Sequence, residues 1–183
     1  QVRRWGITRW SELYNARQLL VHAEVVRLIR EAYQKVIKEE LARGVSRDEA
    51  RDYARAVVTY LTLMFGKLLD YNSTLTVWHT SRGVLVHTFD SHAYAWTWDY
   101  GEFDMVHPTK SGFGWVLENV LKALKGLIRR ASINPEAPCV LFGDAEQLAA
   151  SINHPANSGY DVIFIDPPYL GNVQYSEISE YFY

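Results

Sequence analysis

Two stretches in the first half of the sequence carry the apolar spacing of long amphipathic helices, and they constrain the fold more than any other feature. Apolar residues recur mostly at three- and four-residue intervals across residues 16–44, directly after Asn15, a residue type that caps helix N-termini. Ser46 and Glu49 carry the signature of a capping box, and a second such pattern follows over residues 46–71. Because only the short turn ARGVS separates the two patterns, they predict an antiparallel helical hairpin.

The apolar period changes after the second helix. The runs TLTVWH and GVLVHTF are rich in β-forming residues and flank TSRG, which predicts a short β-hairpin with His79 and His87 facing each other. Two histidines without further ligands do not make a metal site. A third helix is predicted from about Phe113 to Arg130, and the helix dipole alone accounts for the lysines and arginines near its C-terminal end.

An aromatic stripe follows the predicted β-hairpin. Tyr94, Trp96, Trp98 and Tyr100 alternate with smaller residues, and a period of two places all four rings on one face of a strand. Such a face could stack unpaired nucleobases if it were exposed. It could equally pack the helical hairpin onto the following domain, because large rings bury much area, and we favour this second interpretation.

The last quarter of the sequence has the pattern of a βαβ unit. CVLFGDAEQLAASI indicates a strand, a turn and a helix, and YDVIFIDPPY indicates a second, parallel strand followed by a rigid loop. We therefore expect an α/β fold with a helical, aromatic-rich accessory region over residues 1–135 and part of a Rossmann-like sheet over residues 136–183. In such a sheet Asp144 and Asp166 would lie at the C-terminal edges of adjacent strands and open on one cleft.

Composition sets few further limits. The chain has 183 residues, a formal net charge of −2, a single cysteine and no apolar run near the length of a membrane helix, so we expect no membrane partner and a cytoplasmic location. Nucleic-acid binding would then need a local basic patch. The chain begins with Gln1 and ends in SEISEYFY, which has the pattern of early helical turns without a stop signal. We expect the remainder of a longer polypeptide to be its partner.

The segment IFIDPPYL, residues 163–170, carries the chemistry. The two prolines cannot continue a helix and stiffen the chain beyond the predicted strand, which fixes the Asp166 carboxylate relative to the Tyr169 ring. The exocyclic amine of a nucleobase is a poor nucleophile, because its lone pair is delocalised into the ring. Two acceptors, the Asp166 carboxylate and the Pro167 carbonyl, would each take one N–H, and Tyr169 would stack on an extruded base.

The D-P-P-Y motif after an apolar strand resembles the catalytic loop of amino-group methyltransferases. Four ordered blocks of the sequence are similar to the large archaeal and bacterial adenine-specific DNA methylases that contain a zinc ribbon: residues 5–20, 68–83, 142–148 and 166–183. The resemblance implies a partial Rossmann-like methyltransferase sheet, S-adenosylmethionine as cofactor and the amino group of adenine in DNA as substrate.

The resemblance also implies roles for individual residues. Asp166 and Pro167 correspond to the acceptors for the target amine, Tyr169 corresponds to the stacking ring, and Pro168 completes the catalytic motif. Asp144, in the GDA turn, lies where such enzymes often contact the adenine end of the cofactor. Leu170, Gly171, Asn172 and Tyr175 follow the loop; the first two depart from the Tyr-Asp of the family, and the last two match the family pattern but have no assigned role.

The chain lacks one part of such an active site. These enzymes use a glycine-rich turn after a strand, whereas the glycines of residues 111–115 indicate a loop and a helix start, so we expect the chain alone to bind the cofactor weakly or not at all. Cys139 is predicted to be structural. Two alternatives remain, namely an RNA base amino-methyltransferase and a non-catalytic module that binds nucleic acid or a protein.

Overall fold

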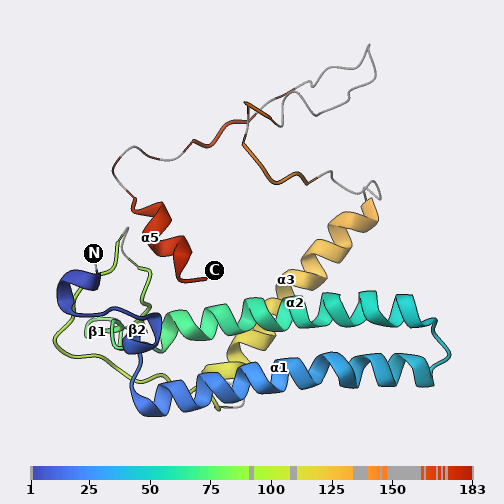
Figure 1. Cartoon of the computed structure of the whole chain (residues 1–183), viewed down its shortest axis with the longest axis horizontal. Coiled ribbons are helices and arrows are strands. Elements are labelled where there is room, and N and C mark those ends of the chain that lie inside the picture. The colour runs from blue at the N-terminus through green and yellow to red at the C-terminus, as the bar shows by residue number, and fades with distance from the viewer. Residues whose placement is uncertain are drawn as a thin grey trace.

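The computed structural model is mostly helical and contains one small β-hairpin (Figure 1). It describes residues 2–90, 93–107, 111–133, 140–144, 146–147, 162, 164–167, 169, 171 and 173–182. Helices α1 and α2 lie antiparallel along the long axis, α3 crosses them, and the C-terminal helix α5 lies at the end that also holds the N-terminus and the β-hairpin. The predicted helical hairpin is therefore confirmed.

Helix α1, Ala16–Ala42, begins at the predicted cap. The Asn15 side chain accepts the Gln18 backbone N–H at 2.9 Å, and the Gln18 side chain accepts the Asn15 N–H at 2.9 Å, so two unpaired donors are satisfied reciprocally. The helix ends before Gly44, which has a φ of 85°, a left-handed conformation that costs glycine little.

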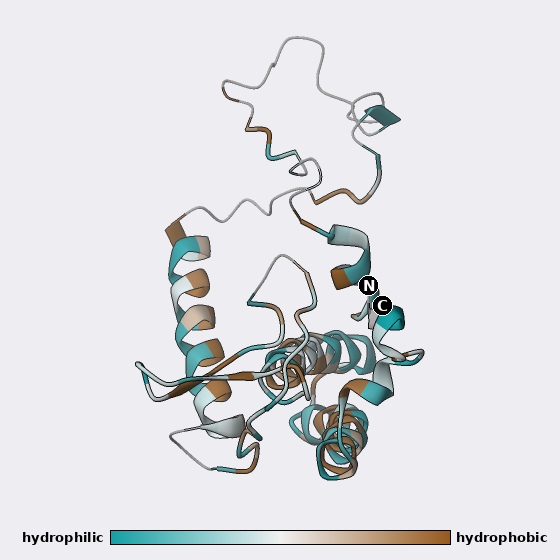
Figure 2. Ribbon diagram, turned by 90° about the vertical axis from the view of Figure 1, so that its left-hand side faces the viewer, coloured by the Kyte–Doolittle hydropathy of each residue, from teal (hydrophilic) through white to brown (hydrophobic). Residues whose placement is uncertain are grey.

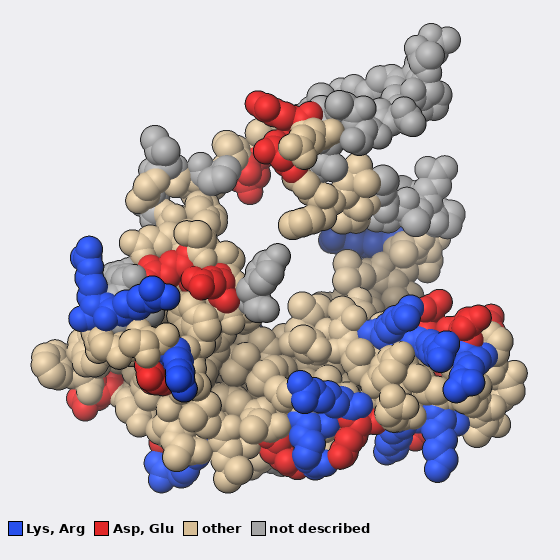
Figure 3. Space-filling view, in the orientation of Figure 1, with Lys and Arg blue, Asp and Glu red and all other residues tan. Residues whose placement is uncertain are grey.

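Helix α2, Arg47–Tyr71, begins at the predicted capping box of Ser46 and Glu49. Each residue of the box accepts the other's backbone N–H at 3.3 Å. Acidic and basic side chains are interspersed along the hairpin surface (Figure 3). Many of them pair three or four residues apart, as Arg55 does with Asp52 at 3.0 Å, so these exposed charges belong to a solvated face.

Two apolar clusters hold the elements together. One joins α2 to α3, Gly112–Ile133, through Met64, Leu68, Met105 and Val116. Viewed along the hairpin, α3 rises on one side of it (Figure 2). The second cluster lies at the terminal end of the hairpin and consists of Leu13, Leu75 and Tyr94 with a rim of aromatic residues. Among the described helices, none is both long enough and apolar enough to cross a membrane.

The predicted β-hairpin is confirmed, with one correction. Strand β1, Val77–His79, pairs antiparallel with β2, Val84–Val86. The prediction that His79 faces His87 is wrong, because His79 lies opposite Val84. His87 instead places Nδ1 3.2 Å from Oδ1 of Asp70 at the end of α2.

The predicted aromatic strand is wrong. Residues 93–100 form an irregular segment, in which Tyr94 is buried while Trp98 is 91% exposed. A side-chain hydrogen bond takes the place of a strand ladder here: Thr97 Oγ1 donates to the Thr74 carbonyl at 3.1 Å. Without a neighbouring strand, nothing holds the segment in the extended form that places alternate side chains on one face. The four rings therefore differ in how far they are buried.

The predicted α/β fold is also wrong, because the described residues contain no parallel sheet and therefore no part of a Rossmann-like sheet. The described residues of the two predicted strands have no regular structure, and Phe142 and Phe164 are 99% and 94% exposed. Parallel strands need further strands at their edges and helices on both faces, which the described chain does not supply. The expected placement of Asp144 and Asp166 on adjacent strand edges fails for the same reason. Much of residues 136–183, Cys139 included, lies outside the described residues.

Candidate functional site

The candidate catalytic loop is exposed. Asp166, Pro167 and Tyr169 are all accessible to solvent, and Pro168 lies outside the described residues. A carboxylate, a backbone carbonyl and an aromatic ring are thus available within four residues of one another in the sequence. This availability is the minimum that contact with an extruded base requires.

A single hydrogen bond among the described residues ties the loop to helix α5, Tyr175–Glu180. The Tyr169 backbone N–H donates to the Tyr175 hydroxyl at 3.3 Å. Tyr175 is the first residue of α5, and a helical side chain leans toward the N-terminal end of its helix, which is where the loop lies. Sequence reasoning gave Tyr175 no role, and the structure assigns it to holding the backbone of Tyr169.

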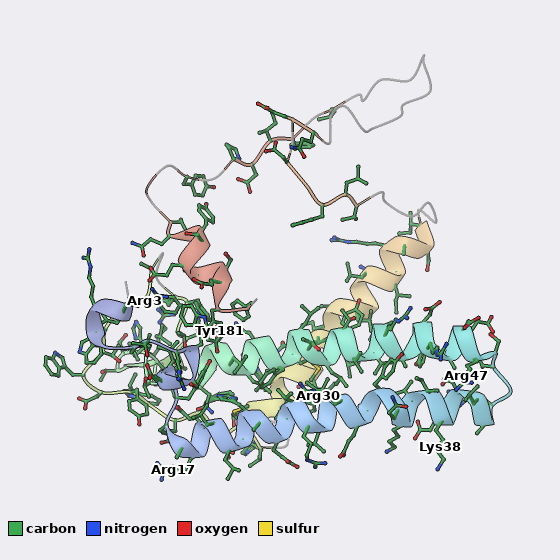
Figure 4. The ribbon with its side chains drawn as sticks, in the orientation of Figure 1. Arg3, Arg17, Arg30, Lys38, Arg47 and Tyr181 are labelled. Atoms are coloured by element: carbon green, nitrogen blue, oxygen red, sulfur yellow. The ribbon has the colours of Figure 1, made fainter. Side chains whose placement is uncertain are left out.

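Helix α5 is in turn anchored by aromatic packing (Figure 4). Tyr181 directly follows α5, and its ring centroid lies 5.2 Å from Phe89 and 5.7 Å from Trp10, the latter at 84° between ring planes. The next residue, Phe182, also packs on Phe89, at 5.3 Å. Rings at such distances and angles stabilise each other beyond the area that they bury.

The anchor joins three of the four sequence blocks defined above. Trp10 and Leu13 belong to residues 5–20, Leu75 belongs to residues 68–83, and Tyr181 belongs to residues 166–183. Backbone bonding reinforces the contact between the first two blocks, because the Leu13 carbonyl accepts both the N–H and the hydroxyl of Thr74, at 2.7 and 2.9 Å. Residues far apart in the sequence therefore converge where α5 ends.

Three titratable side chains of this region, Tyr94, Tyr181 and His22, have shifted pKa values. Burial raises the pKa of the Tyr181 hydroxyl, and burial, followed by the carboxylates of Glu177 and Glu180, raises the pKa of the Tyr94 hydroxyl. Burial lowers the pKa of His22, whose Nε2 lies 3.2 Å from the Asn72 carbonyl. All three side chains are therefore neutral near pH 7.

Two hollows flank α5 on the side of the N-terminal 3₁₀ turns η1, Val2–Trp5, and η2, Trp10–Leu13. One, of about 210 Å³, is lined by Arg3, Ile7, Thr8, Arg9, Trp10, Glu177 and Glu180. The other, of about 620 Å³, is lined by Arg4 and residues 173–177. Arginines of the N-terminal segment thus lie close to the helix that carries the loop.

Asp144 does not join this site in the described structure. Its side chain is exposed, and Oδ1 accepts the Glu146 backbone N–H at 2.9 Å, a local turn contact. No hydrogen bond among the described residues links it to the loop. The described part of the chain also contains no group of three His, Cys, Asp or Glu side chains arranged to hold a metal ion.

Comparison of the chain with protein-family models, with curated proteins and with solved structures finds no match.

Proposed function

We propose that this chain supplies the base-binding loop of an enzyme that methylates the amino group of adenine in DNA. The observation that carries the proposal is the exposed Asp166-Pro167 pair and Tyr169, on a loop tied by Tyr175 to an anchored helix. A base can be recognised there only if the stacking ring and the acceptors keep fixed positions relative to each other. The contact with α5 restrains the Tyr169 end of the loop.

The roles follow from the chemistry of the loop. The Asp166 carboxylate accepts one N–H of the target amine, and the Pro167 carbonyl accepts the other. Pyramidal nitrogen is then favoured, so that its lone pair points away from the ring. Tyr169 stacks on the base and fixes its plane, and its contribution is orientation rather than proton transfer.

The described residues do not form a site that fits S-adenosylmethionine. Asp144 is committed to the Glu146 N–H, and Gly143 beside it follows no strand. The sequence contains no glycine-rich turn of the kind that would bring backbone close to the cofactor. Our proposal therefore assigns cofactor binding to further residues of the parent polypeptide.

The test measures methyl incorporation into adenine-containing duplex DNA by the complete polypeptide that carries these residues. Asp166→Ala should abolish most turnover, and Tyr169→Ala should weaken base binding by roughly 1–3 kcal/mol, whereas Tyr169→Phe should retain most activity. Asp48→Ala, which removes an exposed carboxylate of α2, is the matched control and should methylate at the parental rate. Parental activity of Asp166→Ala would refute the proposal, and unfolding of that variant would make Asp166 a structural residue.

Two other functions are alternatives to this proposal. Transfer to guanine-containing RNA rather than to DNA would favour an RNA amino-methyltransferase. A non-catalytic nucleic-acid module is favoured by the exposed Trp98 together with the missing cofactor cradle. Nucleic-acid binding without methyl transfer by the complete polypeptide would establish that module.

A further inference from the structure

We propose that Trp96 and Trp98, together with Arg3 and Arg4, bind an unpaired stretch of DNA. We call these four residues the tryptophan surface. This inference rests on the proposed function, since extrusion of a target base leaves neighbouring bases accessible. The tryptophan surface would bind the DNA next to the extruded base. It lies at the same end of the molecule as α5, where Arg3 and Tyr181 are both found (Figure 4).

The exposure of the two tryptophans is the first observation. Trp98 is 91% exposed and Trp96 is 50% exposed, although large apolar rings are among the most costly side chains to leave in water. Because the two rings are also in contact with each other, they form a contiguous exposed apolar patch, the kind of surface that marks interaction sites.

The segment that presents them is fixed rather than loose. Tyr94 on one side is buried in the terminal cluster, and the Thr97 hydroxyl between the two tryptophans donates to the Thr74 carbonyl. On the other side the Tyr100 hydroxyl accepts the Asn15 side-chain amide at 3.2 Å. A surface held in this way loses little conformational entropy when it binds.

The rings form a continuous row. The Trp96 ring centroid lies 5.6 Å from that of Trp5 and 6.5 Å from that of Trp98, with interplanar angles of 61° and 88°. An edge-to-face contact covers one face of one ring in each pair and leaves the other ring faces available. Every base presents a π-face once it is unpaired, so successive bases of a single strand can stack along such a row.

Two arginines precede the first ring of the row in the sequence, and the hollows that they line also contain the carboxylates of Glu177 and Glu180. Arg3 and Arg4 immediately precede Trp5 in η1 and are exposed, and neither forms an ion pair with a carboxylate of the described residues. The arginines of the hairpin differ, because Arg27 and Arg55 each pair with an acidic residue three positions away. Unpaired guanidinium groups next to stacking rings are complementary to a phosphate backbone carrying exposed bases.

These features favour a single strand over a duplex. The faces of paired bases are covered by their neighbours in a duplex, so the indole rings would have nothing to stack on. Tryptophan and arginine are also enriched at protein interfaces, so the DNA titration, rather than the composition of the surface, separates the two kinds of partner. The carboxylate of Asp99, next to the rings in sequence, and those of Glu177 and Glu180, in the hollows with the arginines, limit the charge contribution and leave stacking as the larger part.

The test is a titration of the chain against a fluorescently labelled 16-nucleotide single-stranded DNA, followed by anisotropy. Trp98→Ala should weaken binding by roughly 5- to 150-fold, which corresponds to the worth of one stacked base, while Trp98→Phe should retain most of the affinity. Trp78→Ala is the matched control, because Trp78 is 55% exposed on β1 and has no ring contact with the tryptophan surface among the described residues. It should bind as the parent does.

Salt dependence tests the arginines. Each phosphate of a single strand that a cation neutralises adds about 0.7 to the slope of log affinity against log salt. Replacing both Arg3 and Arg4 by glutamine should therefore reduce that slope by about 1.4. A melt of each variant should show an unchanged midpoint, because the altered side chains are exposed.

Several results would overturn the inference: Trp98→Ala binding as tightly as the parent, a duplex of the same sequence binding as tightly as the single strand, or RNA binding more tightly than DNA. The methyl-transfer test stands apart from this one. If Trp98→Ala loses DNA binding while Asp166→Ala still methylates, the catalytic proposal fails and the tryptophan surface remains. If instead Trp98→Ala binds DNA as the parent does while Asp166→Ala loses methyl transfer, the catalytic proposal stands and the tryptophan surface fails.

Discussion

Replacing Tyr181 by alanine should release helix α5 and leave the helical hairpin intact. Six residues are too few to form a stable helix alone, because nucleation costs more than so few hydrogen bonds return. The helix therefore depends on the packing of Tyr181 against Trp10, Tyr14, Phe89 and Phe182. None of these rings belongs to α1 or α2, so the packing within the hairpin is unchanged.

The magnitude follows from burial. Truncating a fully buried phenylalanine or tryptophan to alanine costs about 3–5 kcal/mol. Tyr181 is only partly buried, so we expect Tyr181→Ala to cost about 2–3 kcal/mol of the free energy that docks α5. The four ring pairs support this size, because each is worth about 0.5–1.5 kcal/mol in addition to the area that it buries. A loss of docking free energy of this size raises the opening constant of α5 about 30- to 150-fold.

Amide hydrogen exchange measures that opening directly. The Ile178 N–H donates to the Gln174 carbonyl at 3.1 Å, so its protection factor should fall by the same factor of about 30 to 150, while amides in α1 keep their protection. Tyr181→Phe should exchange as the parent does, and Tyr53→Ala, which removes an exposed tyrosine of α2, serves as the control. Unchanged protection of Ile178 would refute the anchoring argument. Loss of protection in α1 would show that Tyr181 belongs to the global core instead.

Three further predictions concern other parts of the chain. Burial lowers the pKa of His22 below its ordinary value of 6.5, so the protein keeps its full stability above about pH 6.5 and loses stability as the pH falls below it. His22→Gln should remove this loss of stability in acid, measured by melts between about pH 7 and 5. Equal pH profiles of the variant and the parent would contradict the prediction. Ser46→Ala should cost about 1 kcal/mol in denaturant unfolding by removing the α2 cap, and Ser132→Ala should cost less, because Ser132 is exposed near the end of α3. Calorimetry of the chain with millimolar S-adenosylmethionine should detect weak binding or none, and micromolar binding would show that the cofactor site was misplaced.

The helices could be predicted from the sequence because their determinants are local. Asn15 and Ser46 each mark a helix start by a side chain that bonds three residues ahead, and the structure begins α1 and α2 directly after them. The third helix begins at Gly112, next to the predicted start at Phe113. The β-hairpin was predicted from β-forming residues around TSRG, although the histidine register was not, since a short loop allows more than one pairing.

The parts of the fold that were predicted wrongly depend on contacts between residues distant in the sequence. The spacing of apolar residues does not reveal such contacts. The alternation of residues 94–100 has the form of a strand, but the segment has no partner strand among the described residues, and Tyr94 is buried with Leu13 and Leu75 while Trp98 faces water. The two apolar runs of the predicted parallel sheet fail for the same reason. The anchor of the candidate site could not be predicted because Trp10 and Tyr181 lie near opposite ends of the sequence, and the only signal was the richness in aromatic residues at both ends.

The anchor also explains how residues far from the loop can matter for its chemistry. Tyr169 has one described backbone contact, with Tyr175, and Tyr175 has a fixed position only while α5 is docked. Docking depends on Trp10 and Phe89, which come from an N-terminal turn and from the segment after the β-hairpin. The backbone position of the proposed stacking residue therefore depends on the region expected to be accessory. Because Trp5 belongs to the rim of the same cluster and contacts Trp96, the proposed base-binding loop and the tryptophan surface share one support. Under our proposals, a strand bound at this surface would be held at a fixed position relative to the loop.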